Sequence, residues 1–240
     1  MSGHSKWTQI KRQKGATDQK RGILFTKLGK TIAIAAREGG SDPATNFKLR
    51  LAIDQAKSFN MPNDNIDRAI VRGTGKLEGQ PLLEEAIYEG YGPGGVAIIV
   101  FATTDNKNRT SANIKHIFSK FGGALGSPNS VIWMFDKRGI IQIQKTKILN
   151  RDALELTAID AGSEDISDED DILVIATPPD ALERVASAIS PLCSSEGTRD
   201  IAYIAKNTVS GDAHIRQTIE QMLDMFNEDD DVNDYYTNMV

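Results

Sequence analysis

Cysteine is nearly absent from this chain of 240 residues, in which Cys193 is the only one. A single cysteine forms no internal disulfide, and Cys193 has no partner at CxxC spacing, so we expect a reducing compartment and a buried or incidental thiol. Histidine is also scarce, because His4, His116 and His214 lie far apart and have no second ligand at metal-binding spacing. The sequence therefore predicts no zinc site.

Long apolar runs are missing too, since no stretch approaches the roughly 18 residues that a membrane-spanning helix needs. The N-terminus also lacks the apolar core of a secretory signal. We therefore expect a cytoplasmic protein with no membrane partner. Its 40% hydrophobic and 25% charged residues are typical of a globular chain, and 240 residues suffice for two or three domains.

The residue combinations of an enzyme are missing as well. Gly92-Pro93-Gly94-Gly95 predicts a turn between two strands and not a phosphate-binding loop, because no Lys-Ser or Lys-Thr follows it and a β-branched stretch begins at once. Asp105, Asn106 and Arg109 form the most polar group, and capping of the following helix is the simpler explanation for it. The acids between Glu164 and Asp171 lack the glycine and the spacing of a calcium loop. We expect a protein that is not an enzyme and uses no metal or cofactor.

What the chain does have is a strong separation of charge. Residues 1–76 carry 15 Lys or Arg and 6 Asp or Glu, a net charge of +9, whereas the remaining residues carry 13 bases and 27 acids, a net charge of −14. A dense positive surface attracts polyanions and releases counterions from phosphates, which is the usual origin of sequence-independent affinity for nucleic acid. The alternatives are a solvated basic face and a face that docks on the chain's own acidic half.

The basic part predicts three helices. The first begins near Asp18 and ends at the pair Gly39-Gly40, the second follows an expected N-cap at Ser41-Asp42-Pro43, and the third ends at Gly73. One arc of the first helix is apolar and consists of Leu24, Phe25, Leu28, Ile32 and Ala35. An arc on the other side consists of Lys20, Lys27, Lys30 and Arg37. We therefore expect this helix to pack and to bind at the same time.

A basic stretch with one aromatic residue precedes this helix. It could follow a phosphate backbone, with Trp7 either stacking on a base or, as we favour, anchoring the stretch to the helices. The expected nucleic-acid-binding residues are Lys6, Trp7, Lys11, Arg12, Lys14, Lys20, Arg21, Lys27, Lys30 and Arg37. The sequence thus places the expected interface at the N-terminal end of the chain.

Strands and helices alternate from Glu84 onward. Strands are predicted at 86–91, 96–103 and 131–135, and a helix is predicted through Ile114, Ile117, Phe118 and Phe121. A final helix is expected at about 212–226. The acidic residues after it, from Glu228 to Asp234, predict a disordered tail that competes for the basic face.

Residues 139–206 form a separate predicted module with the β-α-β-β-α-β order of a ferredoxin-like fold. Its topology is similar to that of an RNA-recognition sheet. Such sheets contact RNA through aromatic residues on their central strands, whereas residues 140–143 are mostly aliphatic. We therefore do not expect RNA recognition on this sheet.

Several segments together resemble the hallmark segments of the YebC/PmpR family. They are Gly3-His4-Ser5-Lys6-Trp7, Lys20-Arg21-Gly22 with Phe25-Thr26-Lys27-Leu28, Tyr88 to Gly95, and Asp105 to Thr110. The resemblance runs essentially from Met1 to the final helix. It implies an α+β multidomain fold in which a three-helix domain (1–78) is followed by two α/β domains. The first of these takes 79–136 and 208–240, and the ferredoxin-like one (137–207) is inserted in it.

The resemblance implies a nucleic-acid-binding regulator of gene expression. Family members are described as DNA-binding transcriptional regulators, mitochondrial relatives as translational activators of cytochrome c oxidase, and bacterial members are linked to ribosomes stalled on proline-rich sequences. The expected partner is therefore DNA, or ribosomal RNA as the alternative, bound by a monomer through the same basic domain. A protein-interaction scaffold is the second alternative. No recognition helix can be nominated, which weakens a sequence-specific repressor model.

Overall fold

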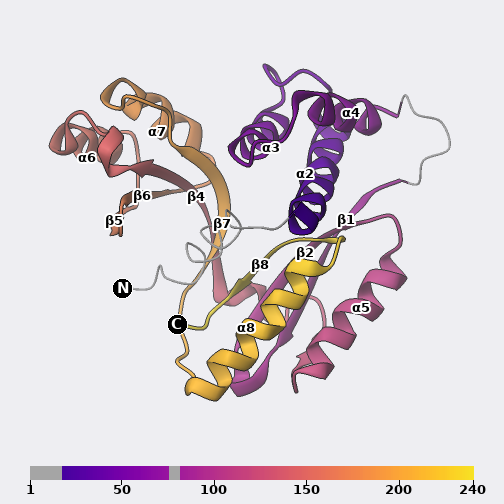
Figure 1. The fold of residues 1–240 in the computed structure, drawn as a ribbon. Helices are drawn as coiled ribbons and strands as arrows, with labels where there is room; N and C mark the ends of the chain where they lie inside the picture. The colour runs from indigo at the N-terminus through magenta and orange to yellow at the C-terminus, as the bar shows by residue number, and fades with distance from the viewer. Residues whose placement is uncertain (1–17, 76–81) are drawn as a thin grey trace. The chain divides into compact units, whose positions relative to one another are not determined.

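The structure, a computed structural model, describes residues 18–75 and 82–240, and the chain divides into two compact units. One unit comprises Met1–Phe135 and Ala205–Val240, and the other comprises Asp136–Ile204 (Figure 1). The second unit is thus inserted into the sequence of the first.

The described part of the first unit starts with three helices, α2 (Asp18–Gly39), α3 (Phe47–Ser58) and α4 (Asn63–Gly73). The apolar arc of α2 packs against α3 and α4, as predicted. The buried residues of this core are Leu28, Ile32, Ala35, Ala36, Leu49, Ala52, Ile53, Ala56, Met61, Ile66 and Ala69. Helical spacing places these residues on one face of each helix. The three faces contact one another and form one small core.

The expected N-cap of α3 at Ser41-Asp42-Pro43 is wrong, because Asn46 caps the helix. The Asn46 side-chain oxygen accepts a hydrogen bond from the backbone N–H of Leu49 at 3.0 Å. Its amide group donates to the carbonyls of Ala35 and Gly40, at 2.7 and 2.8 Å. Asp42 instead closes the turn before the helix, where its carbonyl accepts the N–H of Asn46. One buried side chain therefore caps α3 and ties it to the end of α2.

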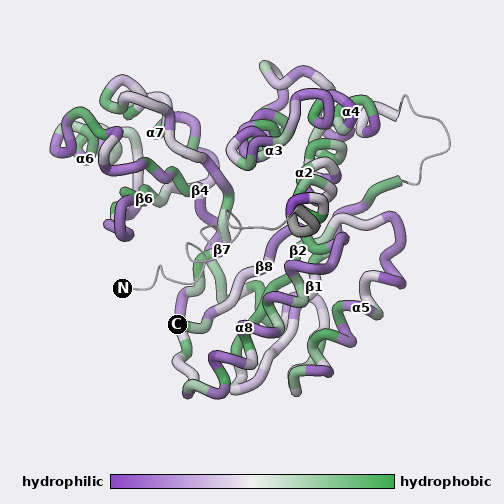
Figure 2. The backbone as a smooth tube through the Cα atoms, viewed as in Figure 1, coloured by the Kyte–Doolittle hydropathy of each residue, from purple (hydrophilic) through white to green (hydrophobic). Residues whose placement is uncertain are grey.

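A four-stranded antiparallel sheet forms the rest of the first unit, in the order β3-β1-β2-β8. Its strands are β1 (Glu84–Tyr91), β2 (Ala97–Thr104), β3 (Ala124–Leu125) and β8 (Val232–Thr237). Two helices, α5 (Lys107–Lys120) and α8 (Ala213–Glu228), lie side by side on one face, where they share a core with β2 and β8 (Figure 1). Figure 2 shows their amphipathic pattern as alternating green and purple bands.

Helix α2 contacts the opposite face of this sheet. The Asn233 amide donates hydrogen bonds to the hydroxyls of Thr31 on α2, at 3.0 Å, and Thr103 on β2, at 2.8 Å. Ala33 and Ile34 of α2 are buried with Leu83, which lies next to β1. A helix that has a core on one side and a sheet on the other is buried over more than one arc.

Two further sequence predictions for this unit are wrong. Residues 131–135 do not form a strand, because Ile132–Met134 is a 3-10 turn and the next strand begins at Phe135. The C-terminal residues are not disordered, since β8 pairs with β2 and its Tyr235 and Tyr236 are buried. Aromatic residues on a strand bury enough apolar surface to order a segment whose net charge predicts disorder.

The second unit is the predicted ferredoxin-like module. Its sheet has the order β5-β6-β4-β7 and its strands are β4 (Phe135–Gln144), β5 (Asp165–Glu169), β6 (Ile172–Thr177) and β7 (Thr198–Ala205). Two helices pack together with it, α6 (Arg151–Asp160) and α7 (Leu182–Ile189). The central strands β4 and β6 pair antiparallel, and Ile141 faces Ile175 across them.

These observations confirm the α+β fold class, with a helical N-terminal domain followed by α/β domains. None of the helices in the described part of the chain combines the length and the apolar character that crossing a membrane demands. Within residues 18–75 and 82–240, His, Cys, Asp and Glu side chains form no group that could hold a metal ion.

Candidate nucleic-acid interface

The predicted binding residues fall into three groups in the structure. Lys6, Trp7, Lys11, Arg12 and Lys14 lie outside the described residues, as does the side chain of Lys20. Arg21 and Arg37 on α2 are exposed. Lys27 and Lys30 are instead brought together on the C-terminal segment of the chain.

Lys27 points away from the three-helix core, as predicted, but it does not reach solvent. Only 8% of its surface is exposed. Its ammonium group donates to the backbone carbonyls of Asn227, at 2.6 Å, and Phe226, at 3.4 Å, where α8 ends. A helix C-terminus carries partial negative charge on its unpaired carbonyls, so it is a suitable partner for a cation. Lys27 therefore serves as a cap for α8 in this structure.

Asp231 is the centre of a buried polar network, with 4% of its surface exposed. One carboxylate oxygen accepts a hydrogen bond from the Lys30 ammonium at 2.7 Å. The other accepts from the Arg109 guanidinium at 2.7 Å, from the Thr110 hydroxyl at 2.8 Å and from the Thr104 hydroxyl at 3.2 Å. These donors come from α2, from β2 and from α5, so one carboxylate joins the helical domain to both ends of the α/β domain.

The pKa values of these groups follow from their burial and their partners. Burial acts to raise the pKa of Asp231, but hydrogen bonds from Arg109, Lys30 and Thr110 outweigh it and lower the pKa to about 2. Burial lowers the pKa of Lys27 to about 8, against the opposing attraction of Asp229, Asp230 and Asp234. Asp231 is thus stabilised as an anion, whereas Lys27 carries its charge at a cost.

The segment Asp105–Thr110 begins α5 and supplies part of this network. Asn106 is the N-cap, and its side chain accepts the Arg109 N–H at 3.1 Å, so the expected helix capping is observed. The Arg109 side chain also pairs with Asp105 at 3.0 Å. Sequence reasoning found the cap but missed the partner Asp231, because that residue lies 122 positions away.

The other exposed cations of the helical domain have varied surroundings. The Arg37 guanidinium donates to the Leu83 carbonyl. The Lys48 ammonium forms ion pairs with Glu38 at 2.9 Å and Glu85 at 3.1 Å. Lys57 is exposed in the last turn of α3, and Arg68 is exposed in α4. Exposed pairs of this kind contribute little to stability, so their cations stay accessible to a competing anion.

A buried glutamate, which sequence reasoning missed, organises the far end of the sheet. The Glu89 carboxylate is 5% exposed and accepts the backbone N–H groups of Asn129 at 2.7 Å and of Val131 and Ile132 at 2.8 Å. Three such hydrogen bonds satisfy a buried carboxylate without a cation. Glu89 therefore fixes the loop that runs from β3 to β4.

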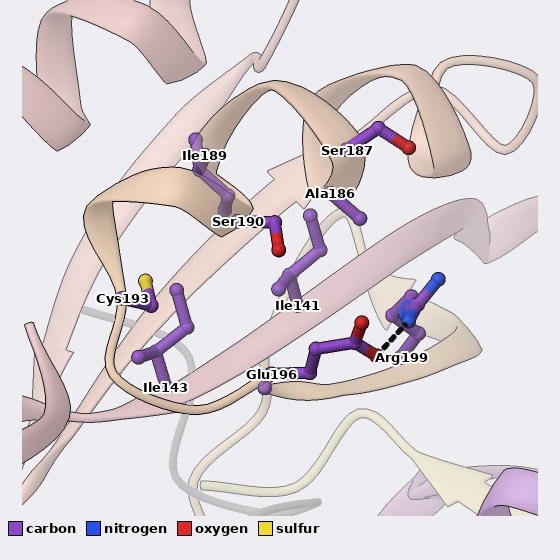
Figure 3. Close-up of a pocket in the computed structure, with 10 residues that line it drawn as sticks. Ile141, Ile143, Ala186, Ser187, Ile189, Ser190, Cys193, Glu196 and Arg199 are labelled. Atoms are coloured by element: carbon purple, nitrogen blue, oxygen red, sulfur yellow. Dashed lines mark hydrogen bonds and ion pairs between the residues drawn. The ribbon is translucent and has the colours of Figure 1, made fainter.

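The second unit contains a pocket of about 230 Å³ between β4, α7 and the chain that leads into β7 (Figure 3). Its floor includes Ile141 and Ile143, and its rim includes Arg199, which pairs with Glu196 at 2.7 Å and Glu183 at 3.0 Å. Burial raises the pKa of the Cys193 thiol there, so the reactive thiolate is scarce at neutral pH. The pocket offers no cation that is not already paired with a carboxylate among its lining residues.

Comparison with known proteins covers nearly the whole chain. Residues 5–76 match the model of the TACO1/YebC protein N-terminal domain, and residues 83–239 match that of the TACO1/YebC second and third domain. A "probable transcriptional regulatory protein" of Thermoanaerobacter pseudethanolicus is 49% identical over 239 residues, which are 100% of this chain and 97% of that protein. One of Thermotoga maritima is 44% identical over 238 residues, 99% of this chain and 93% of that protein.

A solved structure has the same fold. The crystal structure of a conserved hypothetical protein from Aquifex aeolicus superposes with a TM-score of 0.80 at 39% sequence identity, over 92% of this chain and 90% of that chain. The two family models match this chain in successive segments, and the solved structure has the same fold. This chain therefore belongs to the TACO1/YebC family, whose named relatives are regulatory proteins.

Proposed function

We propose that this protein is a nucleic-acid-binding regulator of gene expression that acts on DNA to control transcription. The observation that carries the proposal is the concentration of 15 Lys or Arg in residues 1–76, where the net charge is +9. The names of the relatives, which describe probable transcriptional regulators, support it. A basic domain on an otherwise acidic chain directs a polyanion to one end of the molecule.

The proposed contact surface consists of the cations of the N-terminal segment and of α2 other than Lys27 and Lys30. These are Lys6, Lys11, Arg12, Lys14, Lys20, Arg21 and Arg37, together with Trp7. Lys27 and Lys30 contribute to the positive field, but their ammonium groups donate to the segment from Phe226 to Asp231. Phosphate contacts of this kind fix the position of a nucleic acid without selecting its sequence.

A triple variant, Lys11→Ala, Arg12→Ala and Lys14→Ala, tests this surface. Loss of three phosphate contacts should weaken binding of a 20-base-pair duplex and reduce the slope of log affinity against log salt by about 3. The control removes the same charge from exposed lysines elsewhere, by Lys115→Ala, Lys137→Ala and Lys147→Ala. Equal affinity and equal salt slope in both variants would remove the basic segment from the interface.

Crosslinking in cells followed by sequencing of the bound nucleic acid identifies the target. Promoter DNA is the expected product. Ribosomal RNA would instead support the alternative of a translation factor that uses the same basic domain, because phosphates of either molecule satisfy the same cations. Recovery of neither would favour a protein-interaction scaffold.

A further inference from the structure

Two aromatic side chains of the first unit are exposed beside each other at the far end of the sheet. Trp133 exposes 63% of its surface and Tyr91 exposes 38%. The Trp133 indole N–H and the Tyr91 hydroxyl both donate to one acceptor, the carbonyl of Ser130, at 3.0 and 3.3 Å. The shared carbonyl holds the two side chains at one site, although they come from β1 and from the turn before β4.

The polar atoms of these two rings are already used. Each ring makes its hydrogen bond to Ser130, so the surface that it offers to a partner is ring surface and not a donor group. An exposed indole forgoes the free energy of burial, which for a large aromatic side chain is substantial. An aromatic surface held open in this way is suited to a flat π system.

Hydrogen bonds to Glu89 hold the loop beneath the rings in place. Glu89 accepts three backbone N–H groups of this loop, and the N–H of Gly126 donates to the Glu89 carbonyl at 2.7 Å. Successive residues of β1 point to opposite faces of the sheet. The Cβ position of Gly90 faces Phe118 of α5, so its neighbours Glu89 and Tyr91 lie on the face away from α5 and α8. Because the rings are positioned before any partner arrives, binding costs little conformational entropy.

A cation lies at the edge of this site. The Lys206 ammonium donates to the Trp133 carbonyl at 2.9 Å and the Lys206 N–H donates to the Met134 carbonyl at 2.9 Å. Lys206 is exposed. Two exposed rings with an adjacent ammonium group match the two parts of a nucleotide, a base that stacks and a phosphate that carries negative charge.

We propose that Tyr91, Trp133 and Lys206 form a second nucleic-acid contact, on which an unpaired nucleotide stacks its base. The inference rests on the proposed function and narrows its ligand to nucleic acid with a single-stranded stretch, because bases inside a duplex do not expose their faces to a side chain. The basic N-terminal segment supplies most of the affinity, and the aromatic site selects strands with free bases.

Fluorescence of Trp133 reports directly on stacking. Trp7 and Trp133 are the two tryptophans of the chain, so the Trp7→Phe variant leaves Trp133 as the only tryptophan that can be excited selectively. The affinity of this Trp7→Phe variant is the reference for the titration. Titration with a 12-nucleotide oligo(dT) or oligo(U) should quench the Trp133 emission. Binding of the same strand, carrying a fluorescent label, is followed in parallel by fluorescence anisotropy. A 12-base-pair duplex should bind without quenching. Binding of the single strand with unchanged emission would overturn the aromatic site.

Substitution separates stacking from simple packing. In the otherwise unaltered chain, Trp133→Ala should raise the Kd for the single strand about tenfold, and Trp133→Phe should recover much of the loss because a ring remains. Trp133→Leu, which is apolar without a ring, should behave like Trp133→Ala. Leu156→Ala, at a side chain that is 65% exposed on the second unit, is the control and should change nothing. Thermal unfolding of each variant verifies the fold.

The outcomes distinguish the two proposals. If the Trp133 variants bind the strand as tightly as the parent while the Lys11, Arg12 and Lys14 variant loses affinity, the aromatic site is wrong and the proposed function stands. If neither the parent nor any variant binds nucleic acid at 50 mM salt, both proposals fail. Equal recovery by leucine and phenylalanine would show that apolar packing, and not stacking, supports the strand, and would also overturn the stacking site.

Discussion

Lys30 and Asp231 are 201 positions apart in the sequence, and their ammonium nitrogen and carboxylate oxygen lie 2.7 Å apart in the fold. Both side chains are nearly buried, at 12% and 5% exposure. Removing one partner of a buried pair leaves an uncompensated charge, which is more harmful than losing an exposed pair. This pair therefore links the helical domain to the start of the C-terminal strand, and its loss should lower the stability of the first unit.

Replacement of Asp231 by Asn should destabilise the first unit by about 3 kcal/mol, because Lys30 and Arg109 lose their shared carboxylate. The free energy of unfolding in urea measures the effect. Asp230→Asn is the matched control, since the neighbouring side chain is exposed and only its carbonyl accepts from Lys30. A loss below about 1 kcal/mol for Asp231→Asn, equal to that of the control, would show that the network contributes no more than a surface pair.

The same carboxylate should make stability depend on acidic pH. Its pKa is about 2 in the folded chain and 3.8 as the ordinary value, so the folded state holds the anion more strongly than the unfolded state does. The contribution, about 2 kcal/mol, is complete above about pH 5 and is lost as the pH falls toward 2. The difference in unfolding free energy between the unaltered chain and Asp231→Asn should therefore shrink over this range. A difference that stays constant from pH 6 to 3 would contradict it.

Lys27 should make stability depend on pH in the alkaline range. Its pKa is about 8 when folded and 10.5 as the ordinary value, so between these values the unfolded chain binds more protons and stability rises with pH. From pH 7.5 to 10, the unaltered chain should gain about 2 kcal/mol relative to Lys27→Met, which cannot titrate. Urea unfolding of both proteins at the two pH values measures the gain. Parallel changes in the two proteins would mean that Lys27 is charged and solvated when folded.

Glu89→Gln should loosen the loop beneath the aromatic site. An amide offers one oxygen and places its NH₂ group against backbone donors. The free energy that stabilises the loop should therefore fall by about 3 kcal/mol. Hydrogen exchange of the Asn129, Val131 and Ile132 amides should accelerate, and the Trp133 site should bind more weakly. Glu85→Gln on the same strand is the control, because the Glu85 side chain is exposed and pairs with Lys48. Unchanged exchange rates at the three amides would rule out the anchoring role.

The acidic tail behaves differently from the sequence-based expectation, and this changes how it should be tested. Removal of residues 227–240 would delete β8 and the partners of Lys27 and Lys30, so weaker or tighter nucleic-acid binding of such a chain would reflect a damaged fold. Substitution of exposed acids, such as Glu228→Gln and Asp230→Asn, alters the charge without removing the strand. Tighter binding at low salt would support competition by the acidic segment.

Local patterns in the sequence determined most of the secondary structure. The apolar spacing of Leu28, Ile32 and Ala35 predicted one face of α2 and its packing against α3 and α4. The glycines of residues 92–95 predicted the turn between β1 and β2, where Gly94 and Gly95 have positive φ angles of 71° and 75°. The order of strands and helices in residues 139–206 predicted the ferredoxin-like sheet. Each of these signals depends on residues within a few positions of one another, which is the range that periodicity and turn chemistry report.

Only the tertiary structure decided which charges remain available. The sequence placed Lys27 and Lys30 opposite the apolar arc of α2, and that angular position is observed, but a helix wheel does not reveal that a second surface covers the opposite side. The covering strand, β8, follows a run of acids whose local composition predicts disorder, and it is ordered through Tyr235, Tyr236 and pairing with the distant β2. Burial and ion pairing between residues 200 positions apart are set by packing, so no local pattern encodes whether a cation faces solvent or a buried carboxylate.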